Sequence, residues 1–73
     1  MKFQEIIRSA MKSTGTTQKQ LAEKLGYKSG PSAISVPLTR EDIYAGTFTR
    51  MMNAMGYEVV VRKDGEEMVL TNE

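Results

Sequence analysis

The spacing of hydrophobic residues in this 73-residue chain changes at Gly56, and this change constrains the fold more than any other feature. Before Gly56, apolar residues recur every three or four positions, as in helices that bury one face. After it, two segments rich in β-branched residues flank Asp64-Gly65, a strong signal for a two-residue hairpin turn. The sequence therefore predicts a mainly α domain over residues 1–56, extended by a C-terminal β-hairpin over residues 57–73 of the same domain.

The helical part divides at residues that cap or interrupt helices. Glycines follow the last periodic residues of the first two helices, and two threonines can cap the second helix. If Thr17 is the cap, Gln20 completes a capping box. We expect helices over residues 2–13, from a cap at Thr16 or Thr17 to Gly26, from Pro31 to Leu38 or Thr39, and over residues 45–55.

The third helix contains a proline. Inside a helix, Pro37 lacks a backbone N–H and clashes with the preceding turn, at a cost of about 3 kcal/mol. We therefore expect this helix to be short, kinked or finished in a tighter turn. Its apolar spacing places Ala33, Ile34 and Leu38 inside and leaves Ser32, Ser35 and Val36 outside.

A two-residue turn fixes the register of the hairpin. The predicted cross-strand pairs are Val59–Leu70, Val60–Val69, Val61–Met68, Arg62–Glu67 and Lys63–Glu66. We expect the face with Tyr57, Val59, Val61, Met68 and Leu70 to cover the helices. A lone hairpin is only marginally stable in water and has free edges that can pair with another strand. Dimerisation through the hairpin is therefore as plausible as packing against the helices. The candidate dimer interface comprises Tyr57, Val60, Met68 and Val69.

The composition disfavours most enzyme chemistry. The chain has no cysteine and no histidine, which removes disulfides, thiolate nucleophiles and the commonest general base and metal ligand. The acidic pairs Glu41-Asp42 and Glu66-Glu67 lie in expected turns without a third ligand nearby. We therefore expect no enzyme activity, no cofactor and no metal site.

Hydropathy and the first residues bear on location. No apolar run approaches the roughly 20 residues of a membrane span. Residues 1–5 lack the charged-then-apolar layout of a signal peptide. We expect a cytoplasmic protein that does not contact membranes.

The net charge of +1 conceals an uneven distribution. Residues 1–40 contain seven basic and two acidic residues, a net charge of +5, whereas residues 41–73 contain three basic and seven acidic residues, a net charge of −4. Such asymmetry indicates one face that meets a polyanion, although the charges can also simply solvate two surfaces.

The central segment has the layout of a short helix, a turn and a second short helix. It contains the run T-Q-x-x-L-A-x-x-L-G from Thr17 to Gly26, followed by S-x-I-S from Ser32 to Ser35. Together with residues 48–56, these motifs resemble the lambda-repressor-like, Cro-type helix-turn-helix family over roughly residues 3–57. The ending also resembles small bacterial and phage regulators whose last helix runs into a β-strand. The resemblance implies a four- to five-helix DNA-binding domain with a C-terminal β-hairpin.

The resemblance also implies roles for individual residues. The third helix would enter the major groove of double-stranded DNA and present Ser29, Ser32, Ser35 and Val36 to base edges. Phosphates would be contacted by Thr17, Gln18, Lys28, Thr39 and Arg40. Gln18 can instead serve as a capping side chain, and the flanking residues can be solvated surface groups.

The expected function is that of a sequence-specific transcriptional regulator, a repressor of bacterial or phage type acting as a homodimer. Family members commonly carry Arg, Asn or Gln where this chain has Ser35-Val36-Pro37. This difference implies weak base readout, with affinity resting on a dimer, on DNA shape or on a partner. The alternative is a protein-interaction module on the same fold, such as an antitoxin or phage inhibitor that binds a protein partner.

Overall fold

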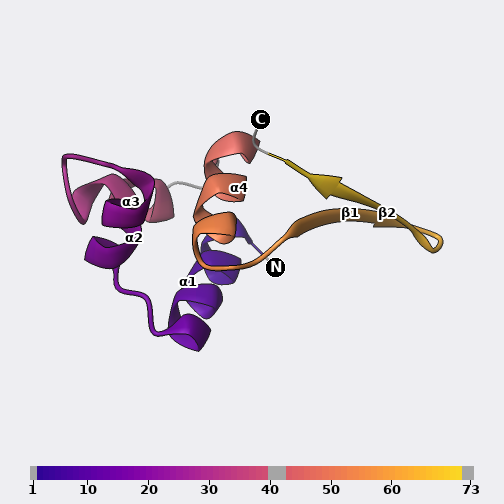
Figure 1. Cartoon of the computed structure of the whole chain (residues 1–73), viewed down its shortest axis with the longest axis horizontal. Coiled ribbons are helices and arrows are strands. Elements are labelled where there is room, and N and C mark those ends of the chain that lie inside the picture. Colours follow the sequence, from indigo (N-terminus) through magenta and orange to yellow (C-terminus); the bar gives the residue numbers. More distant parts are fainter. Residues whose placement is uncertain (1, 40–42, 72–73) are drawn as a thin grey trace.

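The computed structural model describes residues 2–39 and 43–71. In this part of the chain, four helices precede one antiparallel hairpin (Figure 1). The elements are α1 (Phe3–Thr14), α2 (Gln18–Leu25), α3 (Ser32–Thr39), α4 (Ala45–Ala54), β1 (Val59–Lys63) and β2 (Glu66–Leu70). The mainly α class with a C-terminal hairpin is confirmed, and the observed helix limits lie within about one residue of the predicted ones.

The ends of α1 and α2 follow from local capping chemistry. Gly15 and Gly26 adopt left-handed conformations, with φ of 66° and 76°, and end the two helices as predicted. At the start of α2, Gln20 N donates to Thr17 Oγ1 over 3.1 Å, and Thr17 N donates to Gln20 Oε1 over 2.9 Å. The predicted capping box is therefore present, with Thr17 rather than Thr16 as the cap.

The four helices enclose one apolar core. Each helix contributes to it, and α1 and α2 each pack against both α3 and α4. Met51 and Met52 of α4 and Met55, the residue after it, are buried and fill part of the core. The buried apolar residues are Ile7, Ala10, Leu21, Ala22, Ile34, Leu38, Ile43, Phe48, Met51, Met52 and Met55.

The third helix tolerates its proline. α3 begins at Ser32, one residue later than predicted. Pro31 lies just before the helix, and its carbonyl accepts a hydrogen bond from Ser35 N over 3.0 Å. The helix continues past Pro37 to Thr39 and has only eight residues. Ile34 and Leu38 are buried and anchor it to the core. The expectation of a short helix is confirmed.

The hairpin has the predicted register at all five pairs, from Val59–Leu70 to Lys63–Glu66. Asp64 and Gly65 have φ of 46° and 86°, so both turn residues are left-handed, as a type I′ turn requires. Arg62 and Glu67 form an exposed ion pair with 3.1 Å between Nη2 and Oε1.

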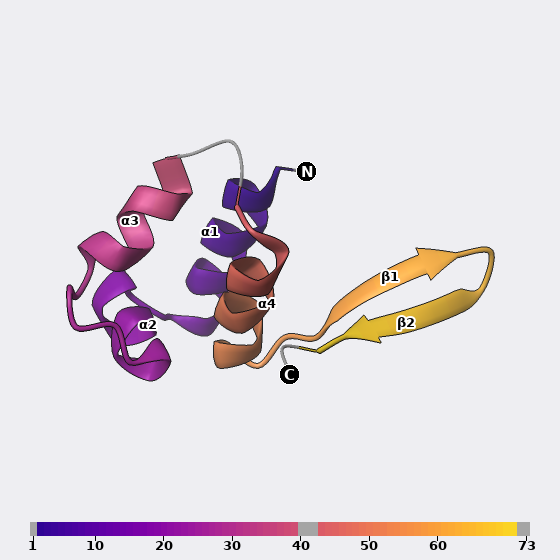
Figure 2. The same ribbon diagram turned by 90° about the horizontal axis from the view of Figure 1, so that it is seen from above.

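The direction of the hairpin differs from the prediction. The face containing Val61 and Met68 does not cover the helices, because the hairpin projects away from them along the longest dimension of the molecule (Figure 2). Val61 and Met68 are 53% and 66% exposed, and of the residues in β1 and β2 only Val59 packs against the core. The cause lies before β1, where Tyr57 N donates to Met52 O and Asn53 Nδ2 donates to Tyr57 O. These bonds secure the chain at the end of α4 as it leaves for the hairpin.

Two further features concern membranes and metals. None of the helices within residues 2–39 and 43–71 combines the length and the apolar character needed to cross a bilayer. In the same residues, no group of three or more acidic, histidine or cysteine side chains is arranged to hold a metal ion.

Candidate nucleic-acid interface

The candidate interface is built on α2, α3 and the turn between them. Gly26 ends α2, after which Tyr27 N donates back to Ala22 O over 2.9 Å and the Tyr27 ring packs against the core. The turn then passes through Gly30, whose φ is 69°, into α3. The two helices are therefore joined by a turn that is itself anchored to the core.

Arg50 of α4 holds this turn from behind. Its guanidinium lies 5.5 Å from the centroid of the Tyr27 ring, and its Nη2 donates to Leu25 O at the end of α2 over 3.5 Å. A cation at this position also complements the negative end of the helix dipole. Sequence spacing does not reveal these contacts, because the partners of Arg50 lie too far away along the chain.

The outer face of α3 is a stripe of small side chains. Ser32, Ser35, Val36 and Thr39 follow one another at helical spacing, on the side opposite the buried Ile34 and Leu38. Val36 is 48% exposed, Ser32 and Thr39 are exposed, and Ser35 is half-buried. Ser29 is exposed in the turn that leads to this face. The four residues predicted to contact bases thus lie on or beside one exposed surface. We call this surface the α3 stripe; it comprises Ser29, Ser32, Ser35, Val36 and Thr39.

Hydrogen bonds orient the hydroxyl groups of the stripe. Ser32 Oγ donates to Ser29 O over 3.0 Å, Ser35 Oγ donates to Ser32 O over 3.4 Å, and Thr39 Oγ1 donates to Val36 O over 2.8 Å. Each hydroxyl proton is directed to the main chain, so each oxygen presents its lone pairs outward. In this state the stripe offers hydrogen-bond acceptors and one apolar side chain, a pattern that the sequence alone does not reveal.

The start of α2 carries the residues predicted to contact phosphates. Thr17 is exposed and uses its hydroxyl as the helix cap. Gln18 is half-buried and takes no part in the capping box, which is formed by Thr17 and Gln20. The capping role considered for Gln18 is therefore wrong. The first N–H groups of α2 provide a positive helix end beside these side chains.

The remaining predicted phosphate contacts flank α3. Lys28 is exposed in the turn, and Thr39 is exposed at the end of the helix. Arg40 lies outside the described residues.

Tyr44 was not predicted as a site residue, yet its side chain is 84% exposed immediately before α4. Helical spacing from Phe48 would place it in the buried stripe, but Tyr44 precedes the helix and points into solvent.

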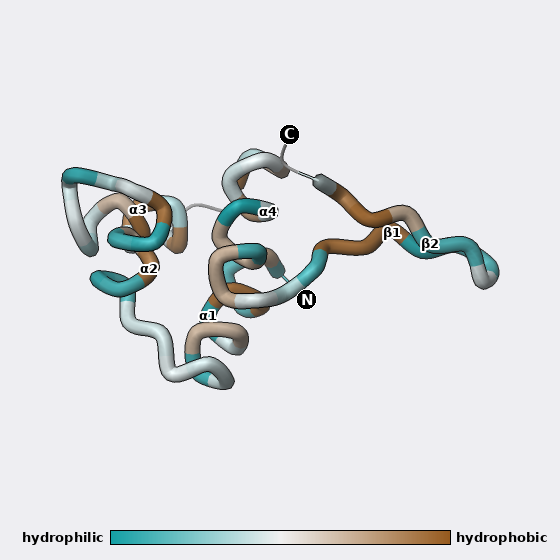
Figure 3. The backbone as a smooth tube through the Cα atoms, in the orientation of Figure 1, coloured by the Kyte–Doolittle hydropathy of each residue, from teal (hydrophilic) through white to brown (hydrophobic). Residues whose placement is uncertain are grey.

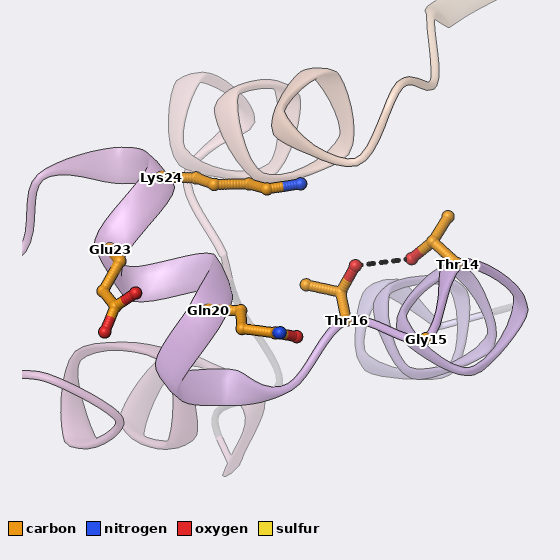
Figure 4. A pocket seen from close by; sticks show the side chains of 6 residues that line it. All are labelled: Thr14, Gly15, Thr16, Gln20, Glu23 and Lys24. Carbon is orange, nitrogen blue, oxygen red and sulfur yellow. Dashed lines mark hydrogen bonds between the residues drawn. The ribbon is translucent and has the colours of Figure 1, made fainter.

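A shallow depression lies between the end of α1 and the outer side of α2 (Figure 4). Its polar groups already bind one another, since Thr14 Oγ1 and Thr16 Oγ1 are 2.7 Å apart and Gln20 belongs to the capping box. Lys24 reaches along its rim toward α4 and donates to Ala54 O over 3.5 Å. Apart from the Glu23 carboxylate, the polar side chains that line the depression are therefore already hydrogen-bonded within the protein.

A comparison of the chain with protein-family models, with curated proteins and with solved structures found no match. The candidate interface consequently rests on the chain's own geometry. That geometry consists of two short helices joined at an anchored turn, with the second helix exposing a face of small side chains. A helix with such a face can approach a groove or a flat surface closely.

Proposed function

We propose that this chain is a sequence-specific DNA-binding transcriptional regulator, a repressor of bacterial or phage type, that places α3 in the major groove. The observation that carries the proposal is the α3 stripe, an exposed face of small side chains on the second helix of an α2–turn–α3 unit. No bulky side chain of the stripe prevents close approach to base edges. The net charge of +5 on residues 1–40 favours a polyanion as the partner of the half of the chain that contains α2 and α3.

The orientation of the hydroxyl groups indicates which bases the stripe would read. Oxygens that present lone pairs accept from the exposed amino groups of adenine and cytosine, and Val36 fits against a thymine methyl. These contacts discriminate less than the paired hydrogen bonds of Arg, Asn or Gln. Lys28, with Thr17 and Gln18 at the start of α2, would bind phosphates and fix the orientation of the protein.

Salt dependence tests the phosphate contacts. Binding to a labelled duplex pool, measured by fluorescence anisotropy over a series of salt concentrations, should weaken linearly on a logarithmic plot. We expect Lys28→Ala to weaken binding to all sequences and to reduce the slope by about 1. The matched control is Lys63→Ala, an exposed lysine next to the hairpin turn, which should leave the slope unchanged. Absence of binding to any duplex at low salt would refute the proposal.

Sequence selection tests the stripe itself. Selection of duplexes from a random pool should yield an enriched sequence for the native chain. We expect Val36→Ala to reduce discrimination at one or two base pairs, by about 1 kcal/mol each, with little change in binding to random DNA. Equal loss of affinity for all sequences would show that Val36 contributes only general contact.

The second candidate function is a protein-interaction module, in which the hairpin holds a protein partner. It is favoured by the exposed apolar residues Val61, Met68 and Val69 and by the lack of Arg, Asn and Gln on α3. The same selection experiment separates the two functions. Enrichment of a duplex that depends on the α3 stripe supports the regulator, whereas failure to select any duplex favours the interaction module.

A further inference from the structure

The outer edge of β1 has main-chain groups without partners in the described part of the chain. The hairpin contains β1 and β2 alone, so each strand has one free edge (Figures 1 and 2). With a two-residue turn, the pairs Lys63–Glu66, Val61–Met68 and Val59–Leu70 exchange hydrogen bonds. Val60 and Arg62 therefore direct their N–H and C=O groups away from β2. This edge is a template for another strand.

The side chains on both faces of the hairpin also lack cover. Val60 and Val69 are 38% and 52% exposed on one face, and Val61 and Met68 are still more exposed on the other. Figure 3 shows that the apolar residues lie at the base of the hairpin and the hydrophilic ones toward its tip. Because a two-stranded sheet is marginally stable alone, additional strands would stabilise this one.

We propose that the β1 edge pairs with β1 of a second copy of this chain, antiparallel about a two-fold axis at Val60. The two hairpins then form one four-stranded sheet in the order β2–β1–β1–β2. The opposed residues across the axis are Val60 with Val60, Val59 with Val61, Glu58 with Arg62, and Tyr57 with Lys63. Val60 in each copy donates its N–H to the carbonyl of Val60 in the other, as residues opposed in a hydrogen-bonded pair do.

Charge complementarity selects this register. It pairs valine with valine, and it places the acidic Glu58 opposite the basic Arg62 twice in each dimer. Moving the two-fold axis by one residue, to Val61, opposes Val59 with Lys63 and Val60 with Arg62. The shifted register also brings Glu58 toward Asp64, a contact between like charges. The register centred on Val60 avoids all three mismatches.

The composition of β2 argues against pairing through the other edge. β2 contains Glu66 and Glu67 and no basic residue. No antiparallel pairing of β2 with itself can therefore join opposite charges, and an axis at Glu67 opposes two glutamates. Since isologous dimers place the same surface on both sides of the axis, self-complementarity is the property that decides between the edges.

The proposed register also predicts where the acidic tip of each hairpin lies relative to the partner copy. Asp64 lies as far beyond Val60 as Gly56 lies before it, so the tip of each hairpin reaches the partner's chain where α4 ends. Lys24 lies at that end of α4, within hydrogen-bonding distance of Ala54 O. The acidic tip of one copy thus approaches a basic side chain of the other. The proposal concerns the pairing of the two hairpins and is independent of DNA binding.

Proline substitutions test which edge pairs. Val60 and Val69 oppose each other without exchanging hydrogen bonds, so each directs its N–H to its own outer edge. Proline is tolerated where a strand N–H faces solvent, and Val60→Pro and Val69→Pro form a matched pair. In sedimentation velocity, Val60→Pro should raise the dimer dissociation constant on the order of 30-fold or more, through loss of two hydrogen bonds. Val69→Pro should leave it within about threefold.

A charge-exchange experiment tests the register without proline. Glu58→Lys alone opposes lysine to Arg62, and Arg62→Glu alone opposes glutamate to Glu58, so each variant should dimerise about tenfold more weakly than the native chain. In an equimolar mixture of the two variants, both contacts across the axis join opposite charges again. The mixture should therefore form heterodimers with an affinity near that of the native homodimer.

Each outcome of these experiments supports or refutes the proposal. A native chain that remains monomeric at millimolar concentration refutes it. Weakening by Val69→Pro rather than by Val60→Pro assigns the dimer to β2 and refutes the β1 edge. If mixing the charge variants restores no association, the register is refuted. Far-UV circular dichroism verifies folding of each variant, and the mixture experiment decides if a proline variant is unfolded.

Discussion

At the scale of single residues, the structure joins side chains that are distant in sequence. Arg50 connects α4 to the end of α2 by stacking on Tyr27 and by donating to Leu25 O. Thr49, its neighbour in α4, is fully buried and donates its hydroxyl proton to Ala45 O over 2.7 Å. Both side chains carry polar groups into or beside the core, and each polar group donates to a main-chain carbonyl, within α4 for Thr49 and at the end of α2 for Arg50. The position of the α2–α3 turn therefore depends on a contact 23 residues away from Tyr27.

Replacement of Arg50 tests this contact. We expect Arg50→Ala to lower the free energy of unfolding by about 1 kcal/mol, since it removes a partly exposed cation–π contact and a charge at a helix C-terminus. For a chain of this length, such a loss lowers the melting temperature by about 4–8 °C. Thermal unfolding followed by circular dichroism measures the change.

Two comparisons sharpen the Arg50 experiment. Arg50→Lys retains the charge but loses the planar group that stacks on Tyr27, so it should recover only part of the lost stability. Arg8→Ala, at an exposed position of α1, should change the free energy of unfolding by less than about 0.5 kcal/mol. Equal effects of Arg50→Ala and Arg8→Ala would show that the contact adds no stability.

At the scale of elements, the helices and the hairpin were predictable because short local motifs determine where they begin and end. Gly15 and Gly26 end helices through their own left-handed conformations, and Thr17 and Gln20 start α2 through a reciprocal pair of hydrogen bonds. Asp64-Gly65 sets the hairpin register, because a two-residue turn allows one pairing. Each of these signals acts within a few residues.

The orientation of the hairpin could not be predicted in the same way. Its two faces both carry apolar residues, with Val61 and Met68 on one and Val60 and Val69 on the other. The alternating pattern therefore did not determine whether either face meets the helices. The outcome depends on how Tyr57 is bound at the end of α4. In α3, likewise, sequence spacing predicted the exposure of Ser32 and Val36, whereas Ala33 and Ser35 are both half-buried, and it did not predict the hydrogen bonds that orient the hydroxyl groups.

The cap of α2 provides a prediction at this scale. Thr17→Ala removes the acceptor for Gln20 N and should lower the free energy of unfolding by about 1 kcal/mol. Thr17→Ser keeps the hydroxyl and should restore most of it. Chemical denaturation measures both changes, and Ser13→Ala, at an exposed position in the last turn of α1, is the control. A smaller effect for Thr17→Ala than for Ser13→Ala would contradict a stabilising capping box.

At the scale of the whole molecule, the core and the hairpin are largely separate. Every buried apolar residue in the described part of the chain lies between Ile7 and Met55. From the hairpin strands, only Val59 packs against this core. The molecule measures 40 × 23 × 23 Å, and the projecting hairpin accounts for its elongation. The helices thus form the stable body, and the hairpin extends from it with both faces in solvent.

Removal of the hairpin should therefore cost little stability. A chain ending after Glu58 retains Tyr57 and its hydrogen bonds to α4, and it loses only the half-buried Val59 from the core contacts. At concentrations where the full chain is monomeric, we expect the free energy of unfolding to fall by about 1 kcal/mol or less, as partial exposure of one valine site implies. Chemical denaturation of the two chains measures the difference. A truncated chain that fails to fold would contradict the separation, and would show that the hairpin stabilises the helices through more than Val59.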